Sequence, residues 1–185
     1  METEIELIKD INKDNYLIEK AAKVIKDGGI VAFPTETVYG LGANALNEEA
    51  VKKIFEAKGR PQDNPLIIHV SNKNLDKYVK DIPECAKIMM EKFWPGPLTI
   101  ILNKKDIIPN VTSANLESVG VRMPREPIAL KLIEMCGVPI AAPSANISGR
   151  PSPTDVERCI EDLNGRVDYI IGGESSDIGV ESTIV

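Results

Sequence analysis

Apolar and polar residues alternate along the chain with two periods, one typical of helices and one of strands. Between residues 15 and 29, Ile18, Ala21, Ala22 and Ile25 fall on one helical face, and two glycines follow as a stop signal. Further helices are predicted from an N-cap at Asn47 to about Gly59, at 84–93, at 127–136 before Gly137 and at about 154–163, and strands at 30–33, 66–70, 98–102, 119–123, 138–142 and 169–171. This alternation predicts an α/β domain with helices packed over a sheet. The pattern leaves strand order open, and a mixed sheet is compatible with it.

Length and composition fit one domain. The chain has 185 residues, of which 43% are hydrophobic and 27% charged, and it shows no internal repeat, low-complexity tract or linker. We therefore expect a single domain over residues 1–185. The net charge of −6 makes the chain a poor general binder of polyanions, so a nucleotide or RNA ligand would need a local basic pocket.

The sequence predicts no signal peptide, no membrane-spanning helix and no structural metal site. The acidic N-terminus lacks the layout of a signal peptide, and no apolar run approaches the roughly 18 residues of a membrane helix. Cys85, Cys136 and Cys159 are widely spaced and form no CxxC pair, which argues against a disulfide framework or a zinc site. We expect a cytoplasmic protein whose three thiols are free and buried.

Three stretches carry more polar chemistry than a connecting turn requires. The first, residues 34–43 (PTETVYGLGA), follows a buried-looking strand with two hydroxyls, a carboxylate, a phenol and two glycines. Loops at strand ends often carry binding groups on a rigid scaffold. A polar turn in which Thr35 or Thr37 caps a local backbone group explains the pattern equally well.

The second stretch, residues 57–70, places Lys58 and Arg60 on either side of a helix-ending glycine. Both side chains can turn toward one anion, Lys as a point charge and Arg as a two-pronged donor, and we expect both to be exposed. Cations that complement a helix C-terminus give the same pattern. His69, the single histidine, lies within an apolar run, which favours a half-buried residue with a satisfied hydrogen bond over a metal ligand.

The third stretch, residues 142–154 (APSANISGRPSPT), runs from a predicted strand into small polar residues and a glycine. Such residues let a backbone approach phosphate or ribose closely, and exposed amides form anion-binding concavities. The stretch matches neither a P-loop nor a dinucleotide-binding GxGxxG. A turn before a helix capped by Thr154 is the alternative.

The sequence offers no nucleophile with an adjacent base, no metal-ligand cluster and no paired acid and base. Its carboxylates are expected on solvated helix faces. The residues alone therefore predict an enzyme or binding protein for an anionic, phosphorylated ligand. Such a protein would act by positioning and charge neutralisation.

The same stretches, in this order, resemble the signature of the YrdC family. The resemblance covers nearly the whole chain and comprises PTETVYGLG, the K-x-R-P-x-x-N-P-L-x-x-H block from Lys58 to His69, WPGPLT, VGVRMP, PSAN followed by SG and SPT, and the closing STIV. It implies an α/β fold with a twisted, largely mixed sheet, flanking helices and a concave basic face.

Resemblance to this family also implies an activity, that of an L-threonylcarbamoyladenylate synthase, which is a nucleotidyltransferase. L-Threonine and bicarbonate form a carbamate, which attacks the α-phosphate of ATP and yields threonylcarbamoyl-AMP and pyrophosphate. Mg²⁺ is implied to arrive with ATP rather than in a site built by the protein. The product serves tRNA modification, so a threonylcarbamoyltransferase complex is the implied partner, and direct contact with tRNA stays open.

The family motifs assign roles to individual residues. Lys58 and Arg60 match the K-x-R motif and are expected to act as the catalytic pair that neutralises phosphate and carbamate charge. The nucleotide side is expected to comprise Lys58, Arg60, Ser118, Ser144, Asn146 and Ser152, and the threonine side Thr35, His69, Arg122 and Ser182. Placing Arg122 against the threonine carboxylate rests on charge matching.

The end of the chain departs from the family pattern, and two other functions stay open. Family members usually continue past STIV, so we expect an incomplete C-terminal end that lacks some nucleotide contacts. An RNA-binding module without catalysis is one alternative, against which the acidic charge and the eight aromatic residues argue. The other is a carbamoyl-adenylate-forming domain like that of hydrogenase-maturation carbamoyltransferases, which would use carbamoyl phosphate.

Overall fold

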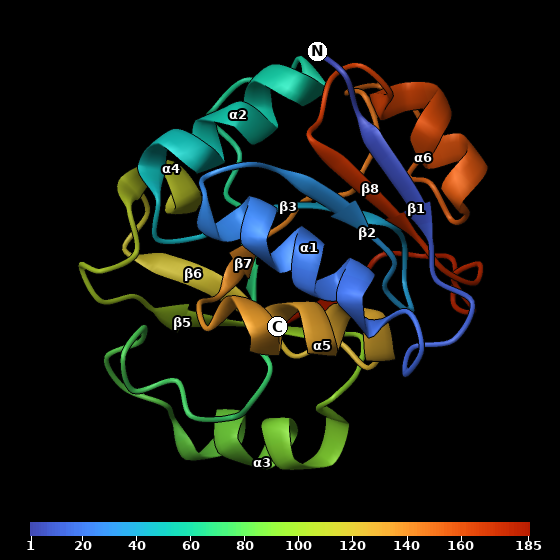
Figure 1. Cartoon of the computed structure of the whole chain (residues 1–185). Coiled ribbons are helices and arrows are strands. Elements are labelled where there is room, and N and C mark those ends of the chain that lie inside the picture. Colours follow the sequence, from blue (N-terminus) through green and yellow to red (C-terminus); the bar gives the residue numbers. More distant parts are fainter.

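The computed structural model describes residues 1–185 and consists of nine strands and six helices (Figure 1). The strands are β1 (Glu4–Leu7), β2 (Val31–Phe33), β3 (Gly40–Asn44), β4 (Ile67–His69), β5 (Leu98–Asn103), β6 (Ser118–Arg122), β7 (Ile140–Ala141), β8 (Tyr169–Gly172) and β9 (Thr183–Ile184). The helices are α1 (Asn15–Lys26), α2 (Glu48–Lys58), α3 (Glu84–Phe93), α4 (Asn110–Ser113), α5 (Pro127–Cys136) and α6 (Val156–Leu163).

All nine strands join in one sheet with the order β1-β8-β2-β3-β7-β4-β6-β5-β9. Four neighbouring pairs are parallel, namely β1 with β8, β2 with β8, β4 with β6 and β5 with β9. The other four pairs are antiparallel. The predicted α/β class and the mixed sheet implied by the family resemblance are therefore confirmed.

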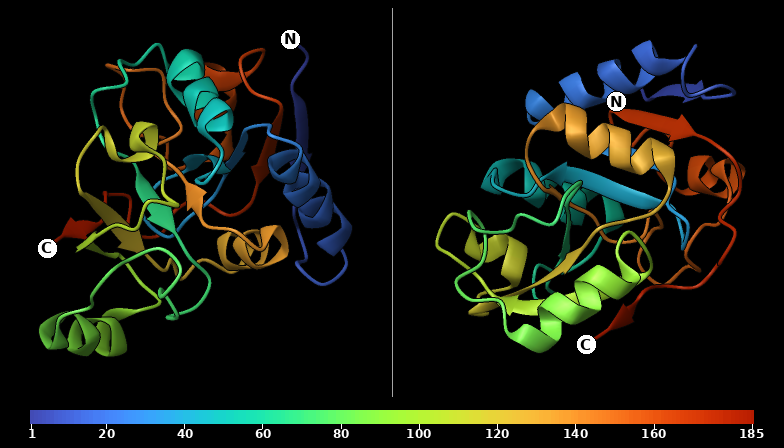
Figure 2. Two further views of the ribbon diagram at one scale, coloured as in Figure 1. Left: turned by 90° about the vertical axis from the view of Figure 1, so that its left-hand side faces the viewer. Right: turned by 90° about the horizontal axis from the view of Figure 1, so that it is seen from below.

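Helices cover both faces of the sheet. Successive strand residues point to opposite sides, so one strand can contribute to the core on each face. Val31 and Phe33 of β2 contribute to the core beneath α1 and α5, which lie side by side (Figures 1 and 2). Ala32, between them, contributes to the larger core that α2 and α6 cover. A strand buried on both faces is apolar throughout, which explains the uninterrupted apolar run in the sequence.

Most predicted helices are confirmed, and their caps follow the sequence. Asn47 caps α2 by accepting a hydrogen bond from the Ala50 N–H at 3.1 Å, and Gly59 ends this helix with a φ of +60°. Gly137 ends α5 in the same left-handed conformation. The cap predicted at Thr154 is wrong, because Asp155 caps α6 through the Arg158 N–H, and the helix begins two residues later than expected.

The remaining differences concern short strands, a short helix and one thiol. β1, β3, α4 and β9 were not predicted, and the strand at 138–142 is reduced to two residues. Cys136 and Cys159 are buried, and burial raises the pKa of both thiols to about 12. Cys85 is exposed, contrary to the prediction, because α3 buries only Ala86 and Met90.

None of the six helices has both the length and the apolar character needed to span a bilayer.

Candidate active site

A pocket of about 190 Å³ opens on the sheet where β4 and β6 end and β3 begins. The three polar stretches of the sequence and the segment before β9 all contribute to its lining. It brings together the predicted residues Thr35, Arg60, His69, Arg122, Ser144 and Ser182, and it adds Thr37, Tyr39 and Glu181. Residues far apart in the chain thus form a single candidate site.

Strand register explains why the polar floor of this pocket forms. Arg122 of β6 pairs with His69 of β4 on one side and with Thr99 of β5 on the other. Directly paired residues project from the same face of a sheet, so the three side chains form a row. The Thr99 hydroxyl lies 2.7 Å from the Ser182 hydroxyl, which places Ser182 at the end of this row.

Arg122 is buried, and most of its hydrogen bonds are made to other groups of the protein. Its guanidinium donates to the Gly96 carbonyl at 3.3 Å, to the Thr37 hydroxyl at 2.9 Å and to the Glu36 carboxylate. Glu36 also accepts the Arg125 backbone N–H at 2.5 Å. Burial lowers the pKa of Arg122, and Glu36 acts in the opposite direction. Three of the five guanidinium N–H groups are used, which leaves two for a ligand.

Glu36 corrects the expectation that the carboxylates lie on solvated helix faces. Its side chain is 3% exposed and forms an ion pair with Arg122. A charge taken out of water needs a partner of opposite charge, and here the partner comes from a strand 86 residues away. The pair neutralises one of the two arginines that line the pocket, so the pocket is less basic than its arginine count implies.

Arg60 is the uncompensated cation of the pocket. The side chain is half-buried, no ion pair involves it, and burial lowers its pKa while Asp63 raises it. A guanidinium in this situation can offer two parallel donors to a phosphate or carboxylate. The structure therefore places Arg60 where an anion can reach it.

Lys58 is buried, which contradicts the prediction that it is exposed. Its ammonium donates to the carbonyls of Ser144 and Asn146 and to the Asn146 side chain, and it does not line the pocket. Burial, together with the smaller effect of the nearby Arg60 charge, lowers the pKa of Lys58 to about 8. The aliphatic part of lysine can be buried with the core while its head group takes backbone acceptors. Lys58 therefore supports the turn at residues 144–146 from behind.

The same turn presents Ser144 to the pocket and keeps Asn146 away from it. The Asn146 side chain accepts the Ser144 hydroxyl at 2.5 Å and donates to the Arg150 carbonyl at 2.8 Å. The Ile147 N–H donates to Asp162 of α6 at 2.9 Å. Asn146 thus acts as an internal brace in this structure rather than as a group facing the pocket.

Two further predicted residues lie outside the pocket. Ser152 donates its hydroxyl at 2.5 Å to Glu181, which does line the pocket. Ser118 begins β6 opposite Asn103, at the other end of the strand from Arg122. At about 3.3 Å per residue, the four-residue separation along the strand amounts to roughly 13 Å. The structure does not bring Ser118 into this site.

His69 is buried and neutral near pH 7, whereas the sequence predicted a half-buried ring. Burial lowers its pKa to about 3, and the charge of Arg122 contributes. Its Nδ1 lies 3.2 Å from the Ile140 carbonyl, which confirms the predicted hydrogen bond. Because a carbonyl can only accept, Nδ1 carries the proton and Nε2 is left as an acceptor.

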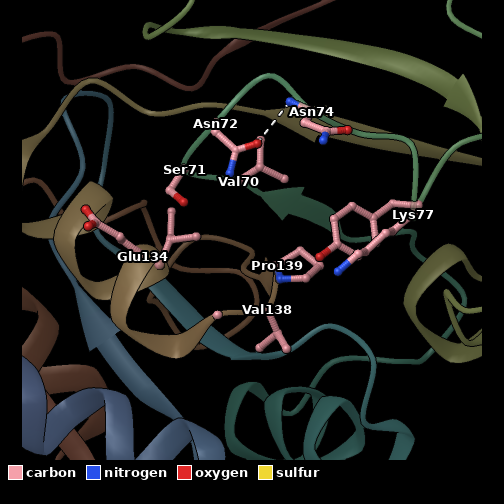
Figure 3. Close-up of a pocket in the computed structure, with 11 residues that line it drawn as sticks. Val70, Ser71, Asn72, Asn74, Lys77, Glu134, Val138 and Pro139 are labelled. Carbon is pink, nitrogen blue, oxygen red and sulfur yellow. Dashed lines mark hydrogen bonds between the residues drawn. The ribbon is translucent and has the colours of Figure 1, made fainter.

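A second, larger pocket of about 310 Å³ contains none of the predicted residues (Figure 3). It lies between the segment after β4, including Asn72 and Lys77, and the segment from Glu134 to Pro139. His69 lines the first pocket, and the next residue, Val70, lines the second. Volume therefore does not single out the pocket that holds the predicted residues.

Several site residues received no role from the sequence. Glu36, Thr37 and Tyr39 belong to the PTETVYG motif, and Glu181 directly precedes Ser182. For Glu36, Thr37 and Tyr39 the position inside a recognised motif was the available signal, whereas Glu181 lies just outside the STIV motif. Tyr39 is fully buried, its hydroxyl accepts the Gly173 N–H at 3.0 Å, and burial raises its pKa to about 12.

Comparisons with known proteins show which family the chain resembles. The Sua5/YciO/YrdC family model, described as telomere recombination, matches residues 23–185. A threonylcarbamoyl-AMP synthase of Pyrococcus abyssi is 56% identical over 93% of this chain and 51% of its own length. One of Bacillus subtilis is 50% identical over 98% of this chain and 53% of its own length. The chain thus spans about half the length of these curated relatives.

Solved structures give the same result. Sua5 of P. abyssi in complex with L-threonine matches with a TM-score of 0.93 and 52% identity over 100% of this chain and 54% of that chain. Full-length HypF in a phosphate- and nucleotide-bound form matches with a TM-score of 0.78 and 26% identity over 90% of this chain and 26% of that chain. The chain belongs to the Sua5/YciO/YrdC family.

Proposed function

We propose that this chain forms threonylcarbamoyl-AMP and pyrophosphate from L-threonine, bicarbonate and ATP, as an L-threonylcarbamoyladenylate synthase. The observation that carries the proposal is the pocket itself, in which a neutral polar floor adjoins an unpaired arginine. The floor suits an amino acid, and the arginine suits phosphate. The relatives in P. abyssi and B. subtilis, both named threonylcarbamoyl-AMP synthase, support this activity.

The threonine side of the proposed site uses the polar row on the sheet. The two free N–H groups of Arg122 would donate to the threonine carboxylate. The threonine hydroxyl would donate a hydrogen bond to Nε2 of His69. Thr35 and Ser182 would complete the contacts. The likeness to Sua5 in complex with L-threonine supports threonine as the amino acid.

The nucleotide side lies beside Arg60 and Ser144. Arg60 would bind phosphate oxygens, and the Ser144 hydroxyl would donate to them, while Lys58 holds the Ser144 carbonyl from behind. The likeness to nucleotide-bound HypF supports this use of the pocket. Mg²⁺ would accompany ATP and neutralise phosphate charge. Mg²⁺ is commonly held through substrate phosphates and few protein ligands, and Glu181 is the carboxylate that lines the pocket and could reach it.

Catalysis in such a site would depend on alignment. A carbamate is unstable and weakly nucleophilic, so it must be held with its oxygen directed at the α-phosphorus. Good alignment supplies about 7–11 kcal/mol in the most favourable intramolecular reactions. Arg60 would stabilise the charge that grows on the phosphate oxygens. The product would pass to a threonylcarbamoyltransferase complex in the cytoplasm, with tRNA contact as a further part of this proposal.

The experiment is pyrophosphate release by the purified chain with ATP, Mg²⁺, bicarbonate and threonine, and with each component omitted in turn. Release that requires both threonine and bicarbonate would support the proposal. Arg60→Ala should lower the rate at least a hundredfold, whereas the exposed Lys87→Ala should not. Pyrophosphate release at the same rate with and without threonine would contradict the proposal.

A carbamoyl-adenylate reaction is the second candidate, because of the likeness to HypF. Carbamoyl phosphate replaces threonine and bicarbonate in a parallel reaction. Adenylate formation from carbamoyl phosphate, without a response to threonine, would favour this second activity. Salt-dependent RNA binding without turnover of either substrate set would favour the RNA-binding alternative.

A further inference from the structure

The charged groups of the candidate site are unevenly balanced. Arg122 is neutralised by Glu36, and His69 is neutral near pH 7. Two groups in the pocket lining have no such compensation, the guanidinium of Arg60 and the carboxylate of Glu181. Glu181 is the single acidic residue that lines the pocket. A carboxylate in a pocket proposed for phosphate and threonine needs a reason, because it repels both of the ligands' anionic groups.

Glu181 sits at the rim of the pocket and is held in place. The side chain is exposed, and it accepts the Ser152 hydroxyl at 2.5 Å. The next residue, Ser182, contacts Thr99 at the end of the polar row. The Thr183 N–H donates to the Pro97 carbonyl at 3.0 Å and anchors the chain where β9 begins. These contacts fix the carboxylate beside the floor on which threonine is proposed to lie.

We infer that Glu181 binds the α-ammonium group of the amino acid and takes a proton from it before the carbamate forms. This inference rests on the proposed function. The carboxylate of threonine is directed to Arg122, so its ammonium needs a separate acceptor. A charge-assisted hydrogen bond to a carboxylate is the strongest available to an ammonium. Among the side chains that line the pocket, Glu181 alone provides one.

The chemistry explains why an anion is useful at this position. An ammonium has no lone pair, so one proton moves from it to the Glu181 carboxylate. The amine nitrogen then forms a bond to the carbon of bicarbonate. The C–O bond to the bicarbonate hydroxyl breaks, and hydroxide leaves as water with a second proton from nitrogen. Glu181, which is exposed, returns its proton to solvent.

The test compares two ligands that differ only at the proposed contact. L-Threonine carries the ammonium, and 3-hydroxybutyrate is the same molecule without it. Calorimetry gives Kd for both ligands with the wild-type chain and with Glu181→Gln, which preserves size and removes the charge. The wild type should prefer threonine, and Glu181→Gln should reduce this preference roughly tenfold to hundredfold, as expected for one hydrogen bond to a charged group. Glu181→Asp should restore part of the preference.

Two matched variants separate the contact from other effects. Glu174→Gln removes a carboxylate from the same connecting segment but outside this pocket, and it should leave the preference unchanged. Ser152→Ala removes the hydrogen bond that holds Glu181, and it should change the preference less than Glu181→Gln. An unchanged preference in Glu181→Gln overturns the inference while the proposed function stands. A wild-type chain that binds neither threonine nor ATP would instead contradict the proposed function.

Discussion

At the scale of single residues, Lys58 shows how burial changes a functional interpretation. Its ammonium is bound to two backbone carbonyls and a side-chain amide. Lys58→Met should therefore destabilise the fold by about 2–5 kcal/mol, because these acceptors lose their donor. Lys52→Met, on the same helix but partly exposed in surface ion pairs, should change the unfolding free energy by less than about 1 kcal/mol. Urea unfolding measures both values, and equal effects would contradict the buried role of Lys58.

His69 gives a pH dependence that a single substitution can isolate. Its pKa is about 3 in the folded protein and 6.5 when unfolded, so the unfolded chain binds the extra proton between these values. The contribution of His69 to the free energy of unfolding is fully present above pH 6.5 and is lost as pH decreases through this window. Between pH 8 and pH 5 the free energy of unfolding should decrease by about 2 kcal/mol more in the wild type than in His69→Asn.

The comparison of the two proteins removes the contribution of other groups. Glu126, whose pKa burial raises to about 7, acts in the opposite direction, because its folded state binds the extra proton. That effect is present in both proteins and cancels in the difference. His69 is the single histidine, so no other imidazole contributes. Unfolding curves with the same pH slope in both proteins would exclude a buried, neutral His69.

At the scale of elements, α6 positions the turn that carries Ser144. Asp162 accepts the Ile147 N–H at 2.9 Å and the Arg150 guanidinium at 2.8 Å. Asp162→Ala should free residues 147–150 and raise the Kd for ATP by about tenfold, the equivalent of one hydrogen bond, while the Kd for threonine changes little. Glu161→Ala, the exposed neighbour, is the control. Calorimetry with each ligand decides, and equal losses for both ligands would contradict a role confined to the nucleotide side.

Elements whose signals are local could be predicted from the sequence. The ranges 84–93 and 127–136 match α3 and α5, because apolar periodicity and end signals lie within a few residues. β3 and β9 could not be predicted in this way. β3 begins inside a stretch that the sequence presents as a polar loop, and β9 has two residues that depend on pairing with β5.

The candidate site was predictable to a similar degree. Motifs identified Thr35, Arg60, His69, Arg122 and Ser144 as residues that could meet, and one pocket contains them. The motifs could not show that Lys58 and Asn146 turn inward, because side-chain direction depends on tertiary contacts. The ion pair between Glu36 and Arg122 was equally hidden, since it joins distant parts of the chain.

At the scale of the whole molecule, one segment links two distant parts of the sheet across the site. Residues 173–182 leave β8 and lead to β9 at the far edge of the sheet (Figure 2). On the way, the Ile178 and Gly179 N–H groups donate to the carbonyls of Glu36 and Thr37, each at 3.0 Å. Glu181 and Ser182 then line the pocket. This segment therefore connects the backbone of the first motif to the rim of the site.

Ligand binding should consequently stabilise this segment more than the opposite edge of the sheet. A ligand that binds only the closed form slows local opening by the factor 1 + [L]/Kd, which is about 100-fold at a ligand concentration of 100 Kd. Hydrogen exchange at Ile178 and Gly179 should slow toward this limit with threonine and a non-hydrolysable ATP analogue. The Ile8 N–H, which donates to Gly172 at 2.8 Å beside β1, serves as the control and should change little. Equal protection of Ile8 and Ile178 would indicate global stabilisation, whereas no protection at Ile178 would show that the segment does not respond to the site.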